Sequence, residues 1–361
     1  MLQRGFTHCI LRPQDLAPSR DDMEVIGAFN PGVADIPTSD GGRDVVLMVR
    51  VAERPRATHR RYTALPRLVP GKGILVEQIP NDQLDPIDRR LVYHVSRDGT
   101  RSIRLTFISH LRMFRSRDGR TVNPHSEARF GPQEPYEAYG VEDPRITRIG
   151  DTYYMTYVAV SAHGAATALA STTNFRTFQR HGMIFCPENK DVVLFPERIS
   201  GRFMAIHRPN PATHFSPPEM WLASSDDLLH WGEHQYLLGR TGDGLSWDAG
   251  RIGGGCPPLR TDDGWLVVYH GNDRKPRGKA VGSYFGAALL LDLEDPGRVV
   301  ARTREPILAP EADFETDGFL PNIIFPTGLV EREEEILVYY GAADANVGVA
   351  GLKRKDVLAT L

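Results

Sequence analysis

A short charged cluster around Asp143 is the first feature of the sequence that could do chemistry. Asp143 belongs to the run EDPR at residues 142–145, directly before a pattern typical of a β-hairpin with its turn at Gly150-Asp151. Proline is tolerated at the start of a strand because no ladder hydrogen bond is lost there. A carboxylic acid fixed just before that proline is a candidate general acid acting on a polar, uncharged ligand.

A second set of residues, spread over later parts of the chain, could bind an oxyanion such as phosphate. Its members are cations, a cationisable imidazole and a phenol, which suit the oxygen atoms of an anion. Arg251 begins the run RIGGG, whose glycines allow the backbone to approach a ligand closely. Taken alone, each basic residue is equally well explained by a salt bridge to a neighbouring acid, so only the combination favours an anion site. The set consists of Lys190, Arg208, Arg251, His270 and Tyr284.

The elements that must position these residues follow a repeated pattern. A proline, a strand, a polar turn and a second strand recur five times, and from the second copy onward the prolines are 144, 196, 258 and 326. These prolines lie 52, 62 and 68 residues apart. Four-stranded units at this spacing predict an all-β fold, a five-bladed β-propeller formed by a single domain over residues 1–361. Two β-sandwich domains are the alternative, but they leave the repeated pattern unexplained.

Equivalent positions of the repeats are expected to meet at the axis of such a propeller, although they lie far apart in the chain. One set of positions directly precedes the prolines. Another set lies at the far end of each hairpin and consists mostly of cations and hydrogen-bond donors, with Asp344 just beyond the last copy. The first set is Asn30, Asp143, Phe195, Cys256 and Phe325, and the second is Arg50, Tyr157, His207 with Arg208, His270 and Tyr340.

Composition and charge exclude several classes of function. The net charge is −3 with acids and bases mixed throughout, which predicts neither a nucleic-acid partner nor a membrane partner. Three cysteines without CxxC spacing predict no disulfide framework and no zinc site, and they fit a reducing compartment. The sequence shows no signal-like segment and no long apolar run, so a cytoplasmic protein is expected. It also lacks HExxH and a helix-opening GxGxxG, so no metal or nucleotide cofactor is expected.

Several phrases of the sequence, in order, resemble glycoside hydrolase family 130. They are YGVEDPRIT, NKDVVLFPERI, AIHRPN, RIGGGCPPL, WLVVYHG and GFLPNIIFPTG, and the resemblance runs from about Asn30 to Asp344. This family contains β-mannoside phosphorylases and some β-mannosidases, built as five-bladed propellers. The resemblance therefore implies an enzyme acting on β-linked mannose within the fold that the repeats predict.

The resemblance also implies roles for individual residues. Asp143 would be the general acid, acting through a hydroxyl group of the mannose, and its pKa is expected to be raised by burial. Three residues would surround the mannose itself, namely Asn30, Arg50 and Asp344. The cationic set would hold phosphate, namely Lys190, Arg208, Arg251, His270 and Tyr284. Inorganic phosphate would then be a co-substrate, with no further cofactor.

The leading hypothesis is an inverting phosphorylase that cleaves a terminal β-mannosidic bond of an oligosaccharide with phosphate, giving α-mannose 1-phosphate. The alternatives are an inverting hydrolase, in which Glu197 or Glu142 activates water, and a glycan-binding propeller without activity. The linkage, β-1,4 or β-1,2, and the acceptor sugar stay open.

The first two repeat prolines, 31 and 144, are 113 residues apart, so residues 54–137 are expected to form an insertion in the first blade region. This insertion is predicted to shape the acceptor subsites, with Arg60, Arg61 and Tyr62 as candidates. It could also reach the channel of a neighbouring subunit, which leaves a homo-oligomer open.

Overall fold

Strands form nearly all of the regular structure in the computed structural model, which describes residues 2–56, 59–211, 216–242, 246–273 and 281–361. The fold is all-β, as the sequence predicts. No helix in these ranges is long and apolar enough to cross a membrane. The helices are single turns, namely η1 (Pro13–Asp15), η2 (Asn81–Gln83), η3 (Pro135–Glu137), α1 (Asp313–Thr316) and α2 (Arg354–Leu358).

The largest sheet has eight strands and combines two neighbouring groups of four. A single parallel pair, Gly140 with Ser109, joins the groups. Gly140 has a φ of 117°, and a Cβ atom there would lie 2.6 Å from the backbone nitrogen of Ser109, so only glycine fits this junction. The groups are β2 (Met23–Pro37), β3 (Arg43–Pro55), β9 (Ile108–Ser116) and β10 (Ala128–Phe130), and β11 (Gly140–Ile149), β12 (Thr152–Ser161), β13 (Gly164–Thr172) and β14 (Gln179–Phe185).

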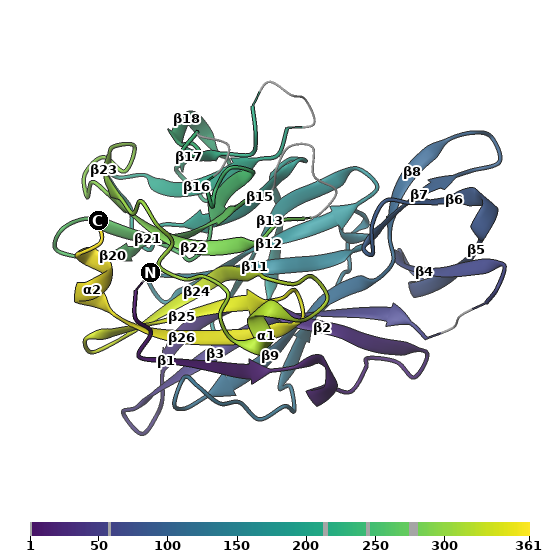
Figure 1. Cartoon of the computed structure of the whole chain (residues 1–361), viewed down its shortest axis with the longest axis horizontal. Coiled ribbons are helices and arrows are strands. Elements are labelled where there is room, and N and C mark those ends of the chain that lie inside the picture. The colour runs from purple at the N-terminus through teal and green to yellow at the C-terminus, as the bar shows by residue number, and fades with distance from the viewer. Residues whose placement is uncertain (1, 57–58, 212–215, 243–245, 274–280) are drawn as a thin grey trace.

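Three further sheets complete the body of the molecule (Figure 1). The third group of strands is β15 (Asn189–Leu194), β16 (Phe203–Pro209), β17 (Met220–Ser225) and β18 (Gly232–Leu238). The fourth is β19 (Arg251–Gly254), β20 (Leu259–Arg260), β21 (Trp265–Asn272), β22 (Tyr284–Leu291) and β23 (Val299–Arg302). The fifth is β24 (Ile324–Arg332), β25 (Glu335–Ala342), β26 (Asn346–Lys353) and β1 (Phe6–Leu11).

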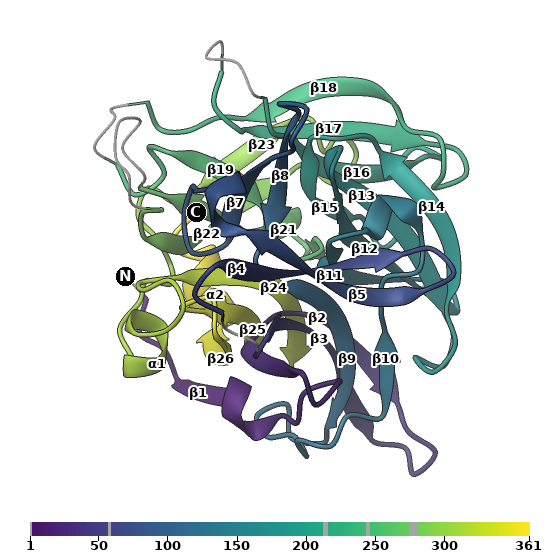
Figure 2. The ribbon, with the colours of Figure 1, turned by 90° about the vertical axis from the view of Figure 1, so that its right-hand side faces the viewer.

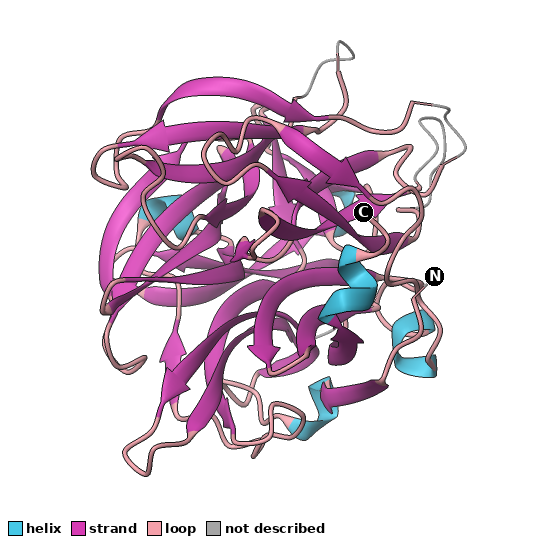
Figure 3. Ribbon diagram, turned by 90° about the vertical axis from the view of Figure 1, so that its left-hand side faces the viewer, coloured by secondary structure: helices cyan, strands magenta, loops and turns pink. Residues whose placement is uncertain are grey.

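The fifth group joins the beginning of the chain to its end, because β1 pairs with β26 in the antiparallel sense. Figure 1 and Figure 3 both show the two ends of the chain near each other.

Apolar side chains hold neighbouring groups of strands face to face. Each of five buried clusters draws its members from two adjacent groups of strands. One of these clusters connects the fifth group with the first. In that cluster Leu47 of β3 packs with Leu337 of β25, although the two residues are far apart in the chain. The core is therefore a cycle of five interfaces rather than one central layer.

In three of these groups the first strand is interrupted by a bulge that contains a residue with positive φ. In β2, β11 and β15 the pairing register shifts around Asn30, Asp143 and Asp191, whose φ angles are 48°, 48° and 55°. Positive φ is uncommon for residues other than glycine and is often found at functional sites. The prediction that Phe195 occupies this position in the third group is wrong. Val192 rather than proline follows the bulge there, and Phe195 lies in the core.

Two small sheets project from the body between β3 and β9 (Figure 1). Seen from their own side, they lie in front of the strands of the body (Figure 2). They form part of the expected 54–137 insertion, whereas β9 and β10 of the same stretch belong to the large sheet. One sheet is β4 (Tyr62–Val69) and β5 (Gly73–Pro80), and the other is β6 (Leu84–Pro86), β7 (Leu91–Val95) and β8 (Arg101–Leu105).

Candidate active site

A cavity of about 830 Å³ collects almost all of the predicted site residues. The exception is His270 of β21, which is fully buried, with its Nε2 atom 3.3 Å from Nη1 of Arg208. The predicted residues that line the cavity are Asn30, Arg50, Asp143, Lys190, Arg208, Arg251, Tyr284 and Asp344.

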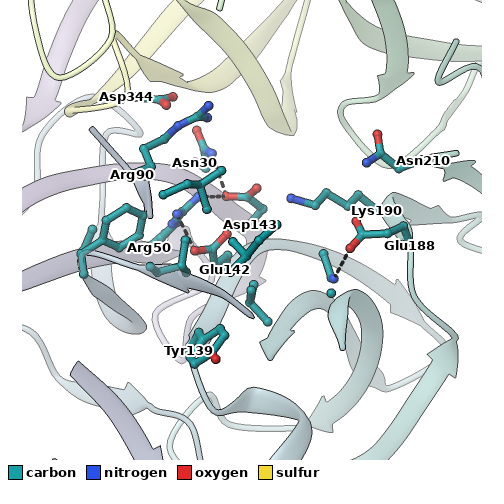
Figure 4. Close-up of a pocket in the computed structure, with 18 of the residues that line it drawn as sticks. Asn30, Arg50, Arg90, Tyr139, Glu142, Asp143, Glu188, Lys190, Asn210 and Asp344 are labelled. Atoms are coloured by element: carbon teal, nitrogen blue, oxygen red, sulfur yellow. Dashed lines mark hydrogen bonds and ion pairs between the residues drawn. The ribbon is translucent and has the colours of Figure 1, made fainter. Parts of the chain in front are cut away.

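One wall of the cavity is a hydrogen-bonded group around Asp143 (Figure 4). Oδ1 of Asp143 accepts hydrogen bonds from Nδ2 of Asn30 (2.7 Å) and from Nη1 of Arg50 (2.9 Å). Arg50 also donates to Oε1 of Glu142 (2.6 Å), and its guanidinium lies 4.5 Å from the ring centre of Phe29. Strands β2, β3 and β11 thus fix both the position and the charge environment of this carboxyl group.

The expectation that burial raises the pKa of Asp143 is wrong. Burial alone acts in that direction, but Arg50, Arg145 and the hydrogen bond from Asn30 together hold the pKa of Asp143 below its ordinary value. Lys190, which points toward Asp143 in Figure 4, acts in the same sense. The carboxyl group is therefore ionised at neutral pH in the ligand-free protein.

A second carboxyl group of the cavity behaves in the opposite way. Asp344 follows β25 and has a φ of 49°. Burial raises the pKa of Asp344 to about 6, because Arg50 and Arg90 only partly offset the cost of desolvation and Asp143 adds to it. Figure 4 shows Arg90 extending toward Asp344. The repeats gave no signal for Arg90, since it lies in the insertion, outside the repeated pattern.

The predicted anion-binding residues come from neighbouring strands on another wall. Lys190 of β15 and Arg208 of β16 are direct partners in the antiparallel pair, so their side chains belong to the same stretch of sheet. Arg251 begins β19 and Tyr284 begins β22. Burial lowers the pKa of His270, and this imidazole is therefore neutral at neutral pH in the ligand-free protein. Lys190, Arg208 and Arg251 give the cavity a cationic wall, and its role in binding phosphate stays a prediction.

Sequence reasoning missed one further residue of this wall, Asp191. It lines the cavity, and its carboxylate lies 2.6 Å from Nη1 of Arg208. The phrase NKDVV contains it, but the proline that marks the equivalent bulges in β2 and β11 is absent, so the repeated pattern does not reveal this residue.

The insertion also contributes to the cavity, although through different residues from those expected. Arg60, Arg61 and Tyr62 are exposed and do not line it. The lining comes from the stretch around β7 and β8, namely Arg90, Leu91, Arg101, Ser102, Ile103, Leu105 and Phe107.

Neither carboxylate suggested as a base for water is free to act as one. Glu197 is exposed, does not line the cavity and pairs with Arg260 at 3.0 Å. Glu142 lines the cavity but is bound to Arg50. Within the described ranges, no group of three or more histidine, cysteine or acidic side chains is arranged to hold a metal ion.

A cavity with carboxyl groups on one wall and cations on another, set in an all-β fold, is typical of an enzyme that acts on a polar substrate together with an anion. Comparison with known proteins defines the family. Its model, described as β-1,4-mannooligosaccharide phosphorylase, matches residues 90–361. The chain belongs to glycoside hydrolase family 130.

Individual relatives agree with this assignment. The chain is 37% identical over 354 residues to a β-1,2-mannobiose phosphorylase from Listeria innocua, covering 97% of this chain and 95% of the relative. It is 36% identical to a 1,2-β-oligomannan phosphorylase from a Thermoanaerobacter species, covering 74% and 86%. The solved structure of the Listeria innocua enzyme with β-1,2-mannobiose superposes with a TM-score of 0.87 at 36% identity, covering 98% of this chain and 99% of that one.

Proposed function

We propose that the protein is an inverting phosphorylase, which uses inorganic phosphate to cleave a terminal β-mannosidic bond and releases α-mannose 1-phosphate. The observation that carries this proposal is the pairing of two walls in one cavity. A carboxyl group held by Asn30 and Arg50 faces a cationic wall that includes Lys190 and Arg208. A hydrolase would need a free carboxylate to activate water in place of that cationic wall.

The proposed reaction assigns one task to each wall. An oxygen atom of phosphate, held by the cationic wall, attacks C1 of the mannose from the face opposite the departing sugar, so the configuration inverts. The departing oxygen atom takes up a proton that Asp143 supplies through a mannose hydroxyl group. Asn30 and Arg50 position Asp143, and Asp344 accepts hydrogen bonds from the mannose.

Phosphate binding would shift the pKa of Asp143 in the direction that an acid requires, although Arg50, Arg145 and the hydrogen bond from Asn30 lower this pKa more than Lys190 does. Lys190 is among the cations that lower the pKa of Asp143 in the ligand-free protein. A phosphate anion beside Lys190 adds negative charge and offsets that cation, which raises the pKa of Asp143. Protonation of Asp143 is thus coupled to the arrival of the second substrate.

The proposed substrate class is a β-1,2-linked mannobiose or short oligomannan. Two relatives named for β-1,2 linkages are 37% and 36% identical to this chain over most of its length. A β-1,4-mannooligosaccharide phosphorylase from Ruminococcus albus is 33% identical over 60% of the chain. The insertion residues that line the cavity, among them Arg90 and Arg101, are proposed to form the acceptor subsites.

The fold supports three related proposals. The cycle of five apolar interfaces, closed by the pairing of β1 with β26, supports a single five-bladed β-propeller whose axis contains the cavity. The insertion belongs to the first blade region of this domain. The three cysteines are free, which fits a reducing cytoplasmic setting.

The test measures mannose release from β-1,2-mannobiose against phosphate concentration, with product identification and β-1,4-mannobiose as the comparison. We expect a saturable phosphate dependence and α-mannose 1-phosphate as product. Arg208→Ala should raise the phosphate KM by roughly tenfold to a hundredfold, because it removes one charge-assisted contact. Arg302→Ala removes another partly buried arginine, paired with Asp248 outside the cavity, and should leave that KM unchanged. A wild-type rate independent of phosphate would contradict the proposal.

A further inference from the structure

Asp191 is a buried carboxylate of the cavity to which the proposed reaction assigns no task. It is 2% exposed and has a left-handed backbone conformation at a bulge of β15. Asn30 and Asp143 occupy the equivalent bulges of β2 and β11. The fold therefore places a polar side chain at this strained position three times, and all three line the cavity. Two of them belong to the wall around the proposed acid, whereas Asp191 belongs to the cationic wall.

The carboxylate of Asp191 lies between three groups that are positively charged or can become so. Its Oδ2 atom is 2.6 Å from Nη1 of Arg208 and 3.3 Å from Nε2 of His270. Its Oδ1 atom is 3.4 Å from Nη2 of Arg145. All four side chains are buried, so solvent screens these contacts only weakly.

The cationic wall needs this negative charge before phosphate arrives. The positive charges of Arg251 and Arg145 disfavour the charged form of Arg208. The carboxylate of Asp191 makes the largest electrostatic contribution that favours this charged form. Without a counter-ion, neighbouring guanidinium groups removed from water repel one another and turn away from the shared space. With it, the groups keep a fixed orientation, which is the condition for binding an anion without rearrangement.

We propose that Asp191 is a positioning residue for phosphate: it holds Arg208 and His270 in the orientation that binds the anion. This inference rests on the proposed phosphorolysis and deepens it. Arg145 extends the arrangement toward the acid, because it contacts Asp191 and also donates a hydrogen bond to the backbone carbonyl of Asp143 (2.7 Å).

Gly253 of β19 shows how closely this arrangement is packed. A Cβ atom at Gly253 would lie 2.5 Å from Oδ2 of Asp191 and 2.8 Å from Nε2 of His270. Gly253→Ala would therefore displace the carboxylate and the imidazole together, without changing any charge. It offers a second, independent way to disturb the same contacts.

The experiment compares wild type with Asp191→Asn, which keeps the shape of the side chain and removes its charge. Initial rates give the KM for phosphate and the KM for β-1,2-mannobiose, and thermal unfolding with and without inorganic phosphate gives a readout of binding independent of turnover. We expect the phosphate KM to rise by about tenfold or more and the phosphate-induced rise in Tm to be lost, whereas the mannobiose KM changes less than about threefold.

Glu53→Gln is the matched control, because Glu53 is also a buried carboxylate paired with an arginine, Arg112 (2.7 Å), outside the cavity. It should lower stability without moving the phosphate KM. If Asp191→Asn does not fold, Gly253→Ala decides by the same separation of the two KM values.

Two outcomes overturn the inference alone. One is a variant that folds and has a phosphate KM within about threefold of the wild-type value. Such a change is smaller than the effect expected from losing one charge-assisted contact. The other is an equal rise in both KM values, which would indicate general damage to the site. A wild-type rate that ignores phosphate overturns the proposed function, and the inference falls with it.

Discussion

At the scale of single residues, the cavity contains two carboxyl groups whose pKa values are shifted in opposite directions. Cations and the amide of Asn30 lower the pKa of Asp143, while burial raises the pKa of Asp344 to about 6. A raised pKa is the usual mark of a general acid. The proposed function instead assigns the acid to Asp143, whose pKa bound phosphate would raise, so the two assignments can be separated by experiment.

Asp143→Asn removes the transferable proton and keeps the shape of the side chain. We expect kcat to fall by roughly 10²- to 10⁴-fold, the range for loss of general acid catalysis, with the mannobiose KM nearly unchanged. Asp344→Asn should act mainly on the mannobiose KM, because that group is proposed to bind the sugar. Steady-state kinetics of both variants at saturating phosphate provide the measurement. If Asp344→Asn instead loses kcat at an unchanged KM, the two roles are reversed.

The raised pKa of Asp344 also predicts a dependence of stability on pH. The folded protein holds this proton up to about pH 6, whereas an unfolded aspartate releases it near 3.8. The stabilising contribution of Asp344 is therefore complete below the lower value and is lost as the pH rises through the higher one. At about pH 8, Asp344→Asn should raise the free energy of unfolding by up to roughly 3 kcal/mol, and by less at about pH 5.

Urea denaturation of wild type and Asp344→Asn at both pH values tests this prediction. Asp248→Asn is a poor comparison because Asp248 pairs with Arg302. Asp262→Asn, in the exposed turn after β20, is the better control and should show no difference between the two pH values. An Asp344→Asn variant that is less stable than wild type at high pH would contradict the assignment of a raised pKa.

At the scale of elements, the sequence predicts what the repeated pattern marks and misses what it does not. The proline after Asn30 and after Asp143 identifies two of the bulged strands, and the hairpins that follow them are confirmed as β2–β3 and β11–β12. Asp191 escapes because Val192 follows it, so the bulge leaves no trace in the local pattern. Arg90 escapes because tertiary folding alone brings the insertion to the cavity.

The insertion yields a prediction about the acceptor sugar. Arg101 of β8 and Arg61 are both exposed residues of the insertion. Arg101 lines the cavity, whereas Arg61 does not. In the reverse reaction, synthesis from α-mannose 1-phosphate, Arg101→Ala should raise the acceptor KM by about two- to fivefold, the effect of one exposed polar contact. Arg61→Ala, the matched control, should leave that KM unchanged. Equal effects of the two variants would place the acceptor subsites elsewhere.

At the scale of the whole molecule, the cavity depends on elements from all parts of the chain. Asn30 and Asp344, at opposite ends of the sequence, line the same space. The pairing of β1 with β26 and the cluster shared by β3 and β25 bring these ends together. Closure of the cycle of sheets is therefore a condition for the site and should be part of one cooperative unfolding unit.

Leu11 provides the test of this cooperativity. It ends β1, is 2% exposed and packs in the cluster that includes Leu47 and Leu337. Leu11→Ala should lower the free energy of unfolding by about 2–5 kcal/mol, the usual cost of a cavity in a packed core. His8→Ala, on the exposed side of the same strand, is the control and should cost less than about 1 kcal/mol.

Denaturant unfolding followed by tryptophan fluorescence, circular dichroism and enzymatic activity should give coincident transitions for both variants, because closure and site belong to one unit. If Leu11→Ala instead produces an early transition that leaves activity and most of the ellipticity intact, β1 is an accessory strand. The cavity would then be maintained by the remaining sheet interfaces without closure at β26.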